Sequence, residues 1–365
     1  MKKALALILS IAMVMAMIVG CGKEEQPAAD DAQQTEETGD ASADSTEPAA
    51  PEINQKIAIL FNSTITDGGF NEGLFKHIND LQAQYGFELS YQENVDDTAV
   101  NDVLRNYASD GYGLIIDAEQ YHCEQILEIA PEFPDVMFGC INGYVCCAPN
   151  FQSISSDMWQ HVYLGGVMAG EVTKSNKIGL ITFSEDSDSA LTMKAAFEGG
   201  AQQVNPDCVC IHVATGSFSD IAAGKEQAAA LVAQGCDVIL CNSGDCNPAV
   251  IEYCIEQKVY SVSAITDRND MDETYVLGSS VTDNDKMLEM ILLPYLNGEF
   301  KGSDTPYVGC LADGIEVFKI NESVKDDFDQ SVFDAMDDVA AKIASGEIKN
   351  AYLEDKEGYK ASLKK

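Results

Sequence analysis

The stretch KIAILFNSTITDGGFN, residues 56–71, decides how the rest of the chain is interpreted. Residues 56–61 form an apolar run of strand length that ends in turn-forming polar residues. From residue 70 to residue 81, apolar side chains recur about four positions apart, which predicts a helix. The stretch therefore predicts a strand, a loop and a helix in succession.

The loop in this stretch carries an acid, an aromatic ring and an amide: Asp67, Phe70 and Asn71. Ligands of open α/β sheets bind beyond the carboxyl ends of the strands, where this loop is expected to lie. Gly68 and Gly69 allow the backbone to approach a ligand closely. The three side chains are therefore candidate ligand contacts. A cap for the helix (Asp67) and a core position (Phe70) are the structural alternatives.

Strand and helix patterns alternate along two successive parts of the chain. The first series ends with a strand at 136–140, and the second begins with a strand at 177–183. Such alternation predicts parallel sheets with right-handed crossovers, so we expect an α/β protein with two doubly wound lobes. Two strands end at acids, Asp117 and Asp267, which adds both to the candidate site. Neither a GxGxxG nor a P-loop motif is present, which disfavours dinucleotide or P-loop nucleotide binding.

Two stretches give weaker signals. Residues 143–160, which contain the only tryptophan, Trp159, are predicted to be irregular. Residues 307–311 and 315–320 look like two strands, with Asp313 and Gly314 between them. That pattern predicts a terminal hairpin.

The N-terminus predicts export. Two lysines precede an apolar run, and Cys21 follows small residues, a pattern that resembles a bacterial lipoprotein signal over residues 1–20. This implies cleavage before Cys21 and a lipid on its sulfur, with a transmembrane anchor as the alternative. Residues 21–52 are rich in acidic residues, Ala, Gln and Pro, and are expected to form a disordered tether. The remainder is expected at the extracytoplasmic face of the cell membrane.

Charge narrows the classes of ligand. Residues 1–52 hold three of the 22 basic and ten of the 60 acidic side chains, so 19 basic and 50 acidic ones remain. A net charge of about −31 argues against nucleic acid and against highly anionic ligands. Apart from Cys21, eleven cysteines are present without a CxxC pair, so we expect neither a metal site nor a disulfide framework.

Six pieces of sequence, in order and in register, now support a family. They are DGGFN at 67–71, YLGGVMAGEVTKSNKIGLI at 163–181, AAFEGGAQQVNP at 195–206, GSFSD at 216–220, GCDVIL at 235–240 and the strand ending at Asp267. Together they resemble the basic membrane protein (BMP) family of substrate-binding lipoproteins of ABC transporters, whose characterised members bind purine nucleosides. The resemblance implies a periplasmic-binding-protein-like fold of type I.

The resemblance also implies roles for individual residues. Phe70 corresponds to an aromatic on which the purine stacks, with Asp67 and Asn71 beside it. Asp267 matches an acid that holds the ribose hydroxyls, and Gly244 matches a glycine-rich turn that faces the sugar.

The chain departs from the family pattern at several positions. Gln160 replaces an acid, Asp283 replaces a lysine, and Leu240 lies where an aromatic is common. Trp159 could supply the missing aromatic surface, and packing between elements of a lobe is its structural alternative. These departures leave open a ligand other than a standard purine nucleoside.

We therefore expect a monomeric, non-enzymatic binding protein without a cofactor that delivers a nucleoside or related molecule to an ABC permease. A sensor that presents a sugar or another small molecule to a membrane receptor is the alternative. An enzyme is disfavoured because no catalytic constellation is evident among the histidines, acids and cysteines. The expected domains are lobe 1 at 53–158 and 267–300, lobe 2 at 159–266 and 301–350, and a tail at 351–365.

Overall fold

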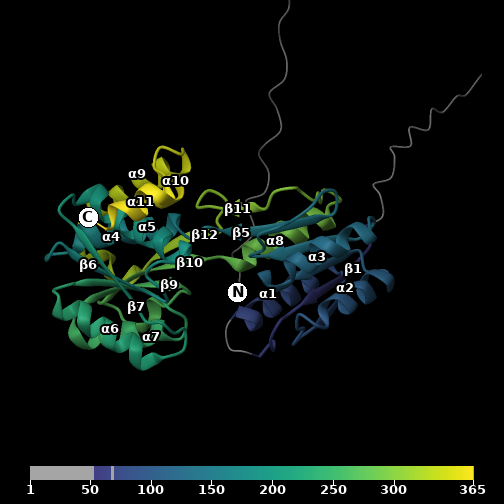
Figure 1. The fold of residues 1–365 in the computed structure, drawn as a ribbon, viewed down its shortest axis with the longest axis horizontal. Helices are drawn as coiled ribbons and strands as arrows, with labels where there is room; N and C mark the ends of the chain where they lie inside the picture. The colour runs from purple at the N-terminus through teal and green to yellow at the C-terminus, as the bar shows by residue number, and fades with distance from the viewer. Residues whose placement is uncertain (1–52, 67–69, 365) are drawn as a thin grey trace, which may run out of the picture. The chain divides into compact units, whose positions relative to one another are not determined.

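The computed structural model describes residues 53–66 and 70–364. The described residues form two six-stranded sheets with helices on their faces (Figure 1), which confirms the predicted α/β class with two doubly wound lobes. The lipoprotein signal, Cys21, the acidic tether and Asp67 lie outside the described residues.

The first sheet has the strand order β11-β5-β4-β3-β1-β2, and all of its neighbouring strands are parallel. Its strands are β1 (Lys56–Leu60), β2 (Glu88–Gln92), β3 (Leu114–Asp117), β4 (Met137–Ile141), β5 (Phe151–Ser156) and β11 (Tyr307–Gly309). The central strands are apolar throughout because both faces of a parallel sheet are covered by helices.

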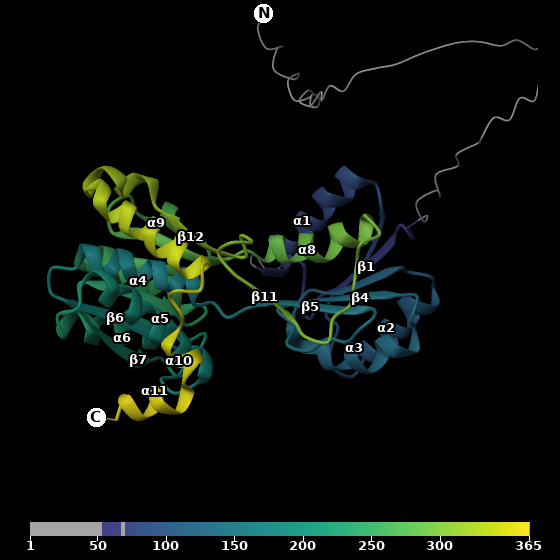
Figure 2. The ribbon, with the colours of Figure 1, turned by 90° about the horizontal axis from the view of Figure 1, so that it is seen from above.

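Alternate residues of β1 contact helices on opposite faces of the first sheet. Ile57 and Ile59 pack with α1 (Phe70–Tyr85) and α8 (Asn284–Leu296). Ala58 and Leu60 pack with α2 (Val100–Ser109) and α3 (Cys123–Ile129) on the other face (Figure 2). The helix α1 is therefore the one predicted from residues 70–81, and its buried stripe (Leu74, Ile78, Leu81) follows the predicted spacing.

The second sheet has the order β12-β10-β9-β8-β6-β7, and only its β10–β12 pair is antiparallel. Its strands are β6 (Lys177–Thr182), β7 (Val209–Ala214), β8 (Val238–Asn242), β9 (Tyr260–Ile265), β10 (Val276–Thr282) and β12 (Glu316–Ile320). One face packs on α4 (Gln160–Val172), α5 (Asp188–Val204) and α9 (Gln330–Ala344), and the other on α6 (Ile221–Ala233) and α7 (Cys246–Gln257).

The small-residue pieces of the sequence are explained by the close packing of α4 against α5. A Cβ on Gly166 would lie 2.2 Å from the carbonyl oxygen of Phe197, and one on Gly200 would lie 2.0 Å from that of Tyr163. Only glycine permits backbones to approach this closely.

Short helices complete the described chain. They are α10 (Ala351–Glu354), α11 (Lys356–Ser362) and four 3-10 turns, η1 (Gln120–His122), η2 (Ala130–Glu132), η3 (Asn269–Met271) and η4 (Glu322–Asp327). The tail expected at 351–365 is thus partly helical, and α10 contacts α5. No helix in the described part of the chain is long and apolar enough to span a bilayer. The cysteines from Cys123 to Cys310 carry free thiols, most of them buried, where they pack as small apolar groups.

The predicted terminal hairpin is wrong. Strand β11 pairs with β5 in the first sheet, whereas β12 pairs with β10 in the second. The turn signal at Asp313 and Gly314 is real, but the chain there passes from one sheet to the other. Residues 143–160 also contain a strand, β5, which the irregular prediction missed.

The expected lobe boundaries also need correction. Strand β10 lies in the second sheet, although residues 267–300 were expected in lobe 1, and β11 lies in the first sheet, although residues 301–350 were expected in lobe 2. Three crossovers connect the lobes: residues 157–159 between β5 and α4, residue 283 between β10 and α8, and residues 310–315 between β11 and β12.

Candidate functional site

A hollow of about 350 Å³, called hollow A here, lies at the crossovers and is lined from both lobes. Its lining residues are Phe70, Glu119, Gln120, Asn142, Ser155, Ser156, Met158, Ile265, Thr282 and Asn284. Among the described residues, this lining combines one aromatic ring, several amides and hydroxyls, and one carboxylate, and it contains no lysine or arginine. Such a surface suits a neutral ligand that offers an apolar face and several hydrogen-bonding groups.

A second hollow of about 430 Å³, called hollow B here, shares Phe70, Ile265, Thr282 and Asn284 with hollow A. Hollow B also contains Lys319, Asp283 and Asp285. Because the two hollows share these residues, Phe70 and Asn284 stand between hollow A, which is lined by the acid Glu119, and hollow B, which is lined by a lysine and two acids.

Phe70 lies where the sequence predicted it, at the first residue of α1 and directly after the loop that follows β1. Its ring is half-buried and lines both hollows. The neighbouring Asn71 is only 3% exposed and does not line either hollow. Of the two loop candidates that the structure describes, Phe70 lines the hollows and Asn71 does not.

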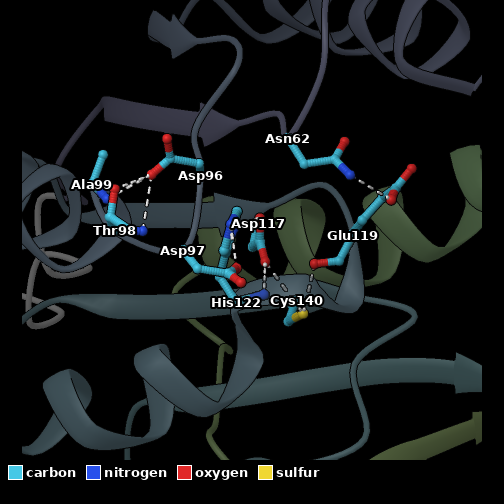
Figure 3. Close-up of polar contacts among 9 residues, drawn as sticks. All are labelled: Asn62, Asp96, Asp97, Thr98, Ala99, Asp117, Glu119, His122 and Cys140. Carbon is cyan, nitrogen blue, oxygen red and sulfur yellow. Dashed lines mark hydrogen bonds and ion pairs between the residues drawn. The ribbon is translucent and has the colours of Figure 1, made fainter.

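Asp117 lies at the end of β3, as predicted, but its side chain is only 1% exposed. Figure 3 shows its carboxylate beside His122. Its two carboxylate oxygens accept hydrogen bonds from the backbone and the ring of His122, both at 3.3 Å. Burial raises the pKa of Asp117, while the hydrogen bond and charge of His122 act in the opposite direction. Asp117 is absent from the lining of both hollows, so the structure gives it contacts inside the first lobe.

Glu119, two residues after Asp117, is the carboxylate that reaches hollow A. The side chain of Asn62, which follows β1, donates a hydrogen bond of 3.2 Å to Glu119 (Figure 3). The thiol of Cys140 contacts the backbone oxygen of Glu119 at 3.5 Å. The ends of β1, β3 and β4 therefore meet around this loop, as parallel strand ends do in an open sheet.

Asp267 lies two residues beyond β9 and is exposed. Its carboxylate lies 3.4 Å from the ammonium of Lys319 and accepts a hydrogen bond from the backbone of Asn269 at 3.1 Å. Lys319 lines hollow B, whereas Asp267 itself lines neither hollow. Asp267 is therefore connected to hollow B by its ion pair with Lys319.

Backbone strain marks the end of β9. Ile265 has a φ of +69°, and the backbone N–H of Thr266 donates to the carbonyl of Ala264 at 2.8 Å, which makes Ile265 the centre of a γ-turn. A β-branched residue in this conformation costs about 1–3 kcal/mol, and such strain clusters at ligand sites. The turn places Ile265 in both hollows.

The remaining candidates make contacts within the protein. The ring of Trp159 packs edge-on against Tyr163 at 6.2 Å between centroids. The side-chain oxygen of Gln160 accepts a hydrogen bond of 3.0 Å from the backbone of Leu311. Gly244 has a φ of +55°, and a Cβ there would lie 2.4 Å from the carbonyl oxygen of Phe218. None of the three candidates lines hollow A or hollow B.

The structure also reveals residues that the sequence interpretation did not select. Asn142, Thr282 and Asn284 lie at or just beyond strand ends and line hollow A, so the strand-end rule could have found them. In the second lobe, Phe183 and Phe218 stack at 4.3 Å with 9° between their planes and are 39% and 58% exposed. Phe218 lies in the GSFSD piece, where an exposed aromatic is a recognisable signal.

Comparison with known proteins now assigns the family. The model for the family described as ABC transporter substrate-binding protein PnrA-like, named Bmp, matches residues 54–354. The chain belongs to the Bmp family. The resemblance inferred from six short motifs is thereby confirmed, and the chain is a substrate-binding protein of the ABC transporter type.

Relatives agree with the assignment at low identity. The Transcriptional activator protein med of Bacillus subtilis is 24% identical over 76% of this chain and 86% of that protein. The ABC transporter nucleoside-binding protein BmpA of Lactococcus lactis is 28% identical over 61% of this chain and 63% of that protein.

A solved structure supports the fold. The ABC transporter solute-binding protein of Conexibacter woesei superposes with a TM-score of 0.63 at 22% identity, covering 80% of this chain and 97% of that one. The periplasmic-binding-protein-like fold is therefore confirmed.

Proposed function

We propose that this Bmp-family protein captures a purine nucleoside in hollow A and delivers it to an ABC permease, without catalysing a reaction. The observation that carries the proposal is the lining of hollow A. It sets the ring of Phe70 beside amide and hydroxyl groups from both lobes, and the part of the lining that the structure describes has no cationic side chain. A nucleoside offers one apolar ring face and a set of hydroxyls, which this lining matches. The name of the Lactococcus relative, a nucleoside-binding protein, supports the same ligand class.

The residue roles in the proposal follow the chemistry of a nucleoside. Phe70 stacks on the base, and Glu119 and Asn142 accept or donate hydrogen bonds to its polar edge or to the sugar. Asp67, Asn71 and the ribose-binding role of Asp267 enter from the family resemblance alone.

The free energy expected from these contacts is large enough for micromolar ligand binding. Stacking contributes about 1–3 kcal/mol per base, and hydrogen bonds to charged groups contribute about 1.5–3 kcal/mol each. One stacking ring, Glu119 and one further acid supplied by the family resemblance together give about 4–9 kcal/mol, a range that includes the roughly 8 kcal/mol of micromolar binding. Neither lysine nor arginine is found among the described residues that line hollow A, which disfavours phosphorylated ligands because their charge would not be offset there.

Location and partners are part of the proposal. A lipid on Cys21 anchors a monomer at the extracytoplasmic face of the cell membrane, and residues 21–52 tether the two lobes to it. The supporting observations are the lysines and the apolar run before Cys21, and the acidic composition of the segment after it. Labelling with a radioactive fatty acid tests the anchor, and substitution of Cys21 by alanine is expected to abolish the label.

The experiment that tests the ligand is calorimetric titration of the purified full-length protein with purine and pyrimidine nucleosides, nucleoside monophosphates and sugars. Unfolding the protein and analysing released small molecules by mass spectrometry precedes the titration. Purine nucleosides are expected to bind, and their monophosphates are expected to bind much more weakly. Binding of sugars alone would contradict the proposal and would favour the sensor alternative, since hydroxyl and amide groups also suit sugars.

A further inference from the structure

The three crossovers meet at one buried carboxylate. Glu316 is the first residue of β12, directly after the crossover at 310–315, and its side chain is fully buried. It pairs with Thr282, the last residue of β10, in the antiparallel register of these strands. The neighbouring backbones are also joined, because Asp283 donates to the carbonyl of Ile315 at 2.7 Å. The second and third crossovers are therefore tied at this point.

The carboxylate of Glu316 also joins the first crossover to the other two. The contacts of Glu316 with the three crossovers are called the junction here. One oxygen accepts a hydrogen bond of 2.9 Å from the hydroxyl of Ser156, the last residue of β5. The other accepts from the backbone N–H groups of Gln160 and His161 at 2.6 and 3.1 Å. These N–H groups open α4, where a negative charge is favoured by the helix dipole. Glu316 thus caps α4 from another part of the chain and holds β5 and α4 together.

Residues at or beside these crossovers also line hollow A, and they are called its floor here. Ser155, Ser156, Met158 and Thr282 line the hollow and belong to, or directly flank, the crossovers that Glu316 joins. The hydroxyl of Ser156 is committed to Glu316 and also accepts a hydrogen bond of 2.9 Å from the backbone of Met158. The position of the floor therefore depends on the carboxylate.

We propose that Glu316 is a positioning residue whose ionised carboxylate preorganises the floor of hollow A, so that its protonation loosens the junction and weakens ligand binding. The inference rests on the proposed function, because hollow A must be the ligand site. A preorganised site binds more tightly since less ordering is required on binding. A protonated carboxyl group turns one acceptor oxygen into a donor and can no longer accept all three bonds.

The titration of Glu316 falls in the neutral range. Burial raises its pKa to about 7, although its hydrogen bonds act in the opposite direction and the charge of Asp157 raises it further. Burial lowers the pKa of His161 to about 3, so this ring stays neutral while Glu316 titrates. The other titratable groups on the crossovers around Glu316 are Asp283, Cys310 and Asp313.

Stability and binding should respond to acid in opposite directions. The pKa of Glu316 is raised in the folded state above its ordinary value of 4.5, so the fold takes up a proton as the pH falls through about 7. Protonation therefore raises the free energy of unfolding as the pH falls from about 7 to about 4.5. In the same pH range, we expect protonation to weaken ligand binding. If Glu316 only supported the fold, its protonation would change stability without weakening ligand binding.

The test uses Trp159, the only tryptophan, which lies in the first crossover next to Gln160. Its fluorescence is recorded in ligand-free, full-length protein from about pH 5.5 to about pH 8.5, a range that brackets the titration. The wild type is expected to show a transition near pH 7, and Glu316→Gln is expected to lack it. Asp157→Asn should keep the transition but move its midpoint to lower pH. Glu171→Gln, a matched change at the other end of α4, should leave it unaltered.

Inosine, adenosine and guanosine are titrated calorimetrically at both ends of the same pH range. The wild type is expected to lose up to about tenfold in affinity on acidification, as for a pKa that differs by one unit between free and bound protein. Glu316→Gln should bind with the weaker affinity at both pH values and should melt at a higher temperature than wild type at the alkaline end. Nucleoside affinity that is independent of pH in the wild type would overturn the proposal.

The two proposals can fail separately. If no nucleoside binds but the Trp159 transition is present and Glu316→Gln removes it, the ligand proposal fails and the junction is supported. If nucleosides bind and the Trp159 transition survives in Glu316→Gln, the junction proposal is overturned.

Discussion

Asp117 and Asp267 each end or follow a parallel strand, one in each sheet, but their side chains have different surroundings. Each lies at or just beyond the carboxyl end of a parallel strand, β3 in the first sheet and β9 in the second. Asp117 is 1% exposed and hydrogen-bonded to His122, whereas the side chain of Asp267 is 43% exposed and pairs with Lys319. A strand-end position therefore brings a carboxylate to the edge of the sheet, and the loop that follows decides whether it faces a ligand.

This contrast suggests that the buried acid contributes to the stability of the fold and the exposed acid to ligand affinity. A buried carboxylate that satisfies a buried partner supports the fold, because its removal leaves that partner unpaired. An exposed ion pair contributes little to stability, so its carboxylate is available for a ligand at small cost. The comparison predicts that substitutions at the two acids act on different measurements.

The largest effect is expected from Asp117→Ala, which should lower the free energy of unfolding by about 3 kcal/mol. The substitution removes both hydrogen bonds to His122 and leaves Nδ1 of this buried ring without its partner. Urea unfolding measures the change. Asp97→Ala is the matched control, since the exposed Asp97 lies 3.8 Å from the same His122 ring. Full stability of Asp117→Ala together with lost nucleoside binding would restore the direct ligand role that the sequence suggested.

Phe70→Ala should come next and should act on affinity. Loss of a stacking face is expected to cost about 1–3 kcal/mol, or roughly five- to 140-fold in the dissociation constant for nucleosides. Calorimetric titration measures it, and circular dichroism shows whether the fold is kept. Tyr85→Ala removes an exposed aromatic from the other end of α1 and should leave binding unchanged. Equal binding by wild type and Phe70→Ala would remove hollow A from consideration.

Asp267→Ala is expected to weaken nucleoside binding about tenfold, which is about 1.4 kcal/mol. Its ion pair with Lys319 is exposed on both sides, so the free energy of unfolding should change by less than about 1 kcal/mol. Asp270→Ala, an exposed acid in the same segment, is the control. Unaltered affinity in Asp267→Ala would mean that this acid, unlike its counterpart in the family, does not reach the ligand.

The sheets were predictable from sequence because buried parallel strands are apolar throughout and alternate with amphipathic helices. Strand β5 was missed because FQSISS has only two apolar residues, Phe151 and Ile154, and lies near a sheet edge. The hairpin was predicted from a genuine turn signal. Local sequence does not reveal that the strands on the two sides of a turn join different sheets.

The site was predictable only in part. Phe70 was found because the loop after the first strand has a recognisable composition. The burial of Asp117 depends on His122 and the short η1 turn, which no strand-end rule includes. The junction at Glu316 joins residues about 156 to 160 positions away in sequence, so no local pattern could have indicated it.

The most direct test of the nucleoside proposal is calorimetric titration of the wild type with inosine and inosine monophosphate. Inosine is expected to bind with a dissociation constant of about a micromolar or below, and the monophosphate is expected to bind at least about tenfold more weakly. Equal affinity for the two ligands, or binding of neither one nor any other purine nucleoside, would contradict it.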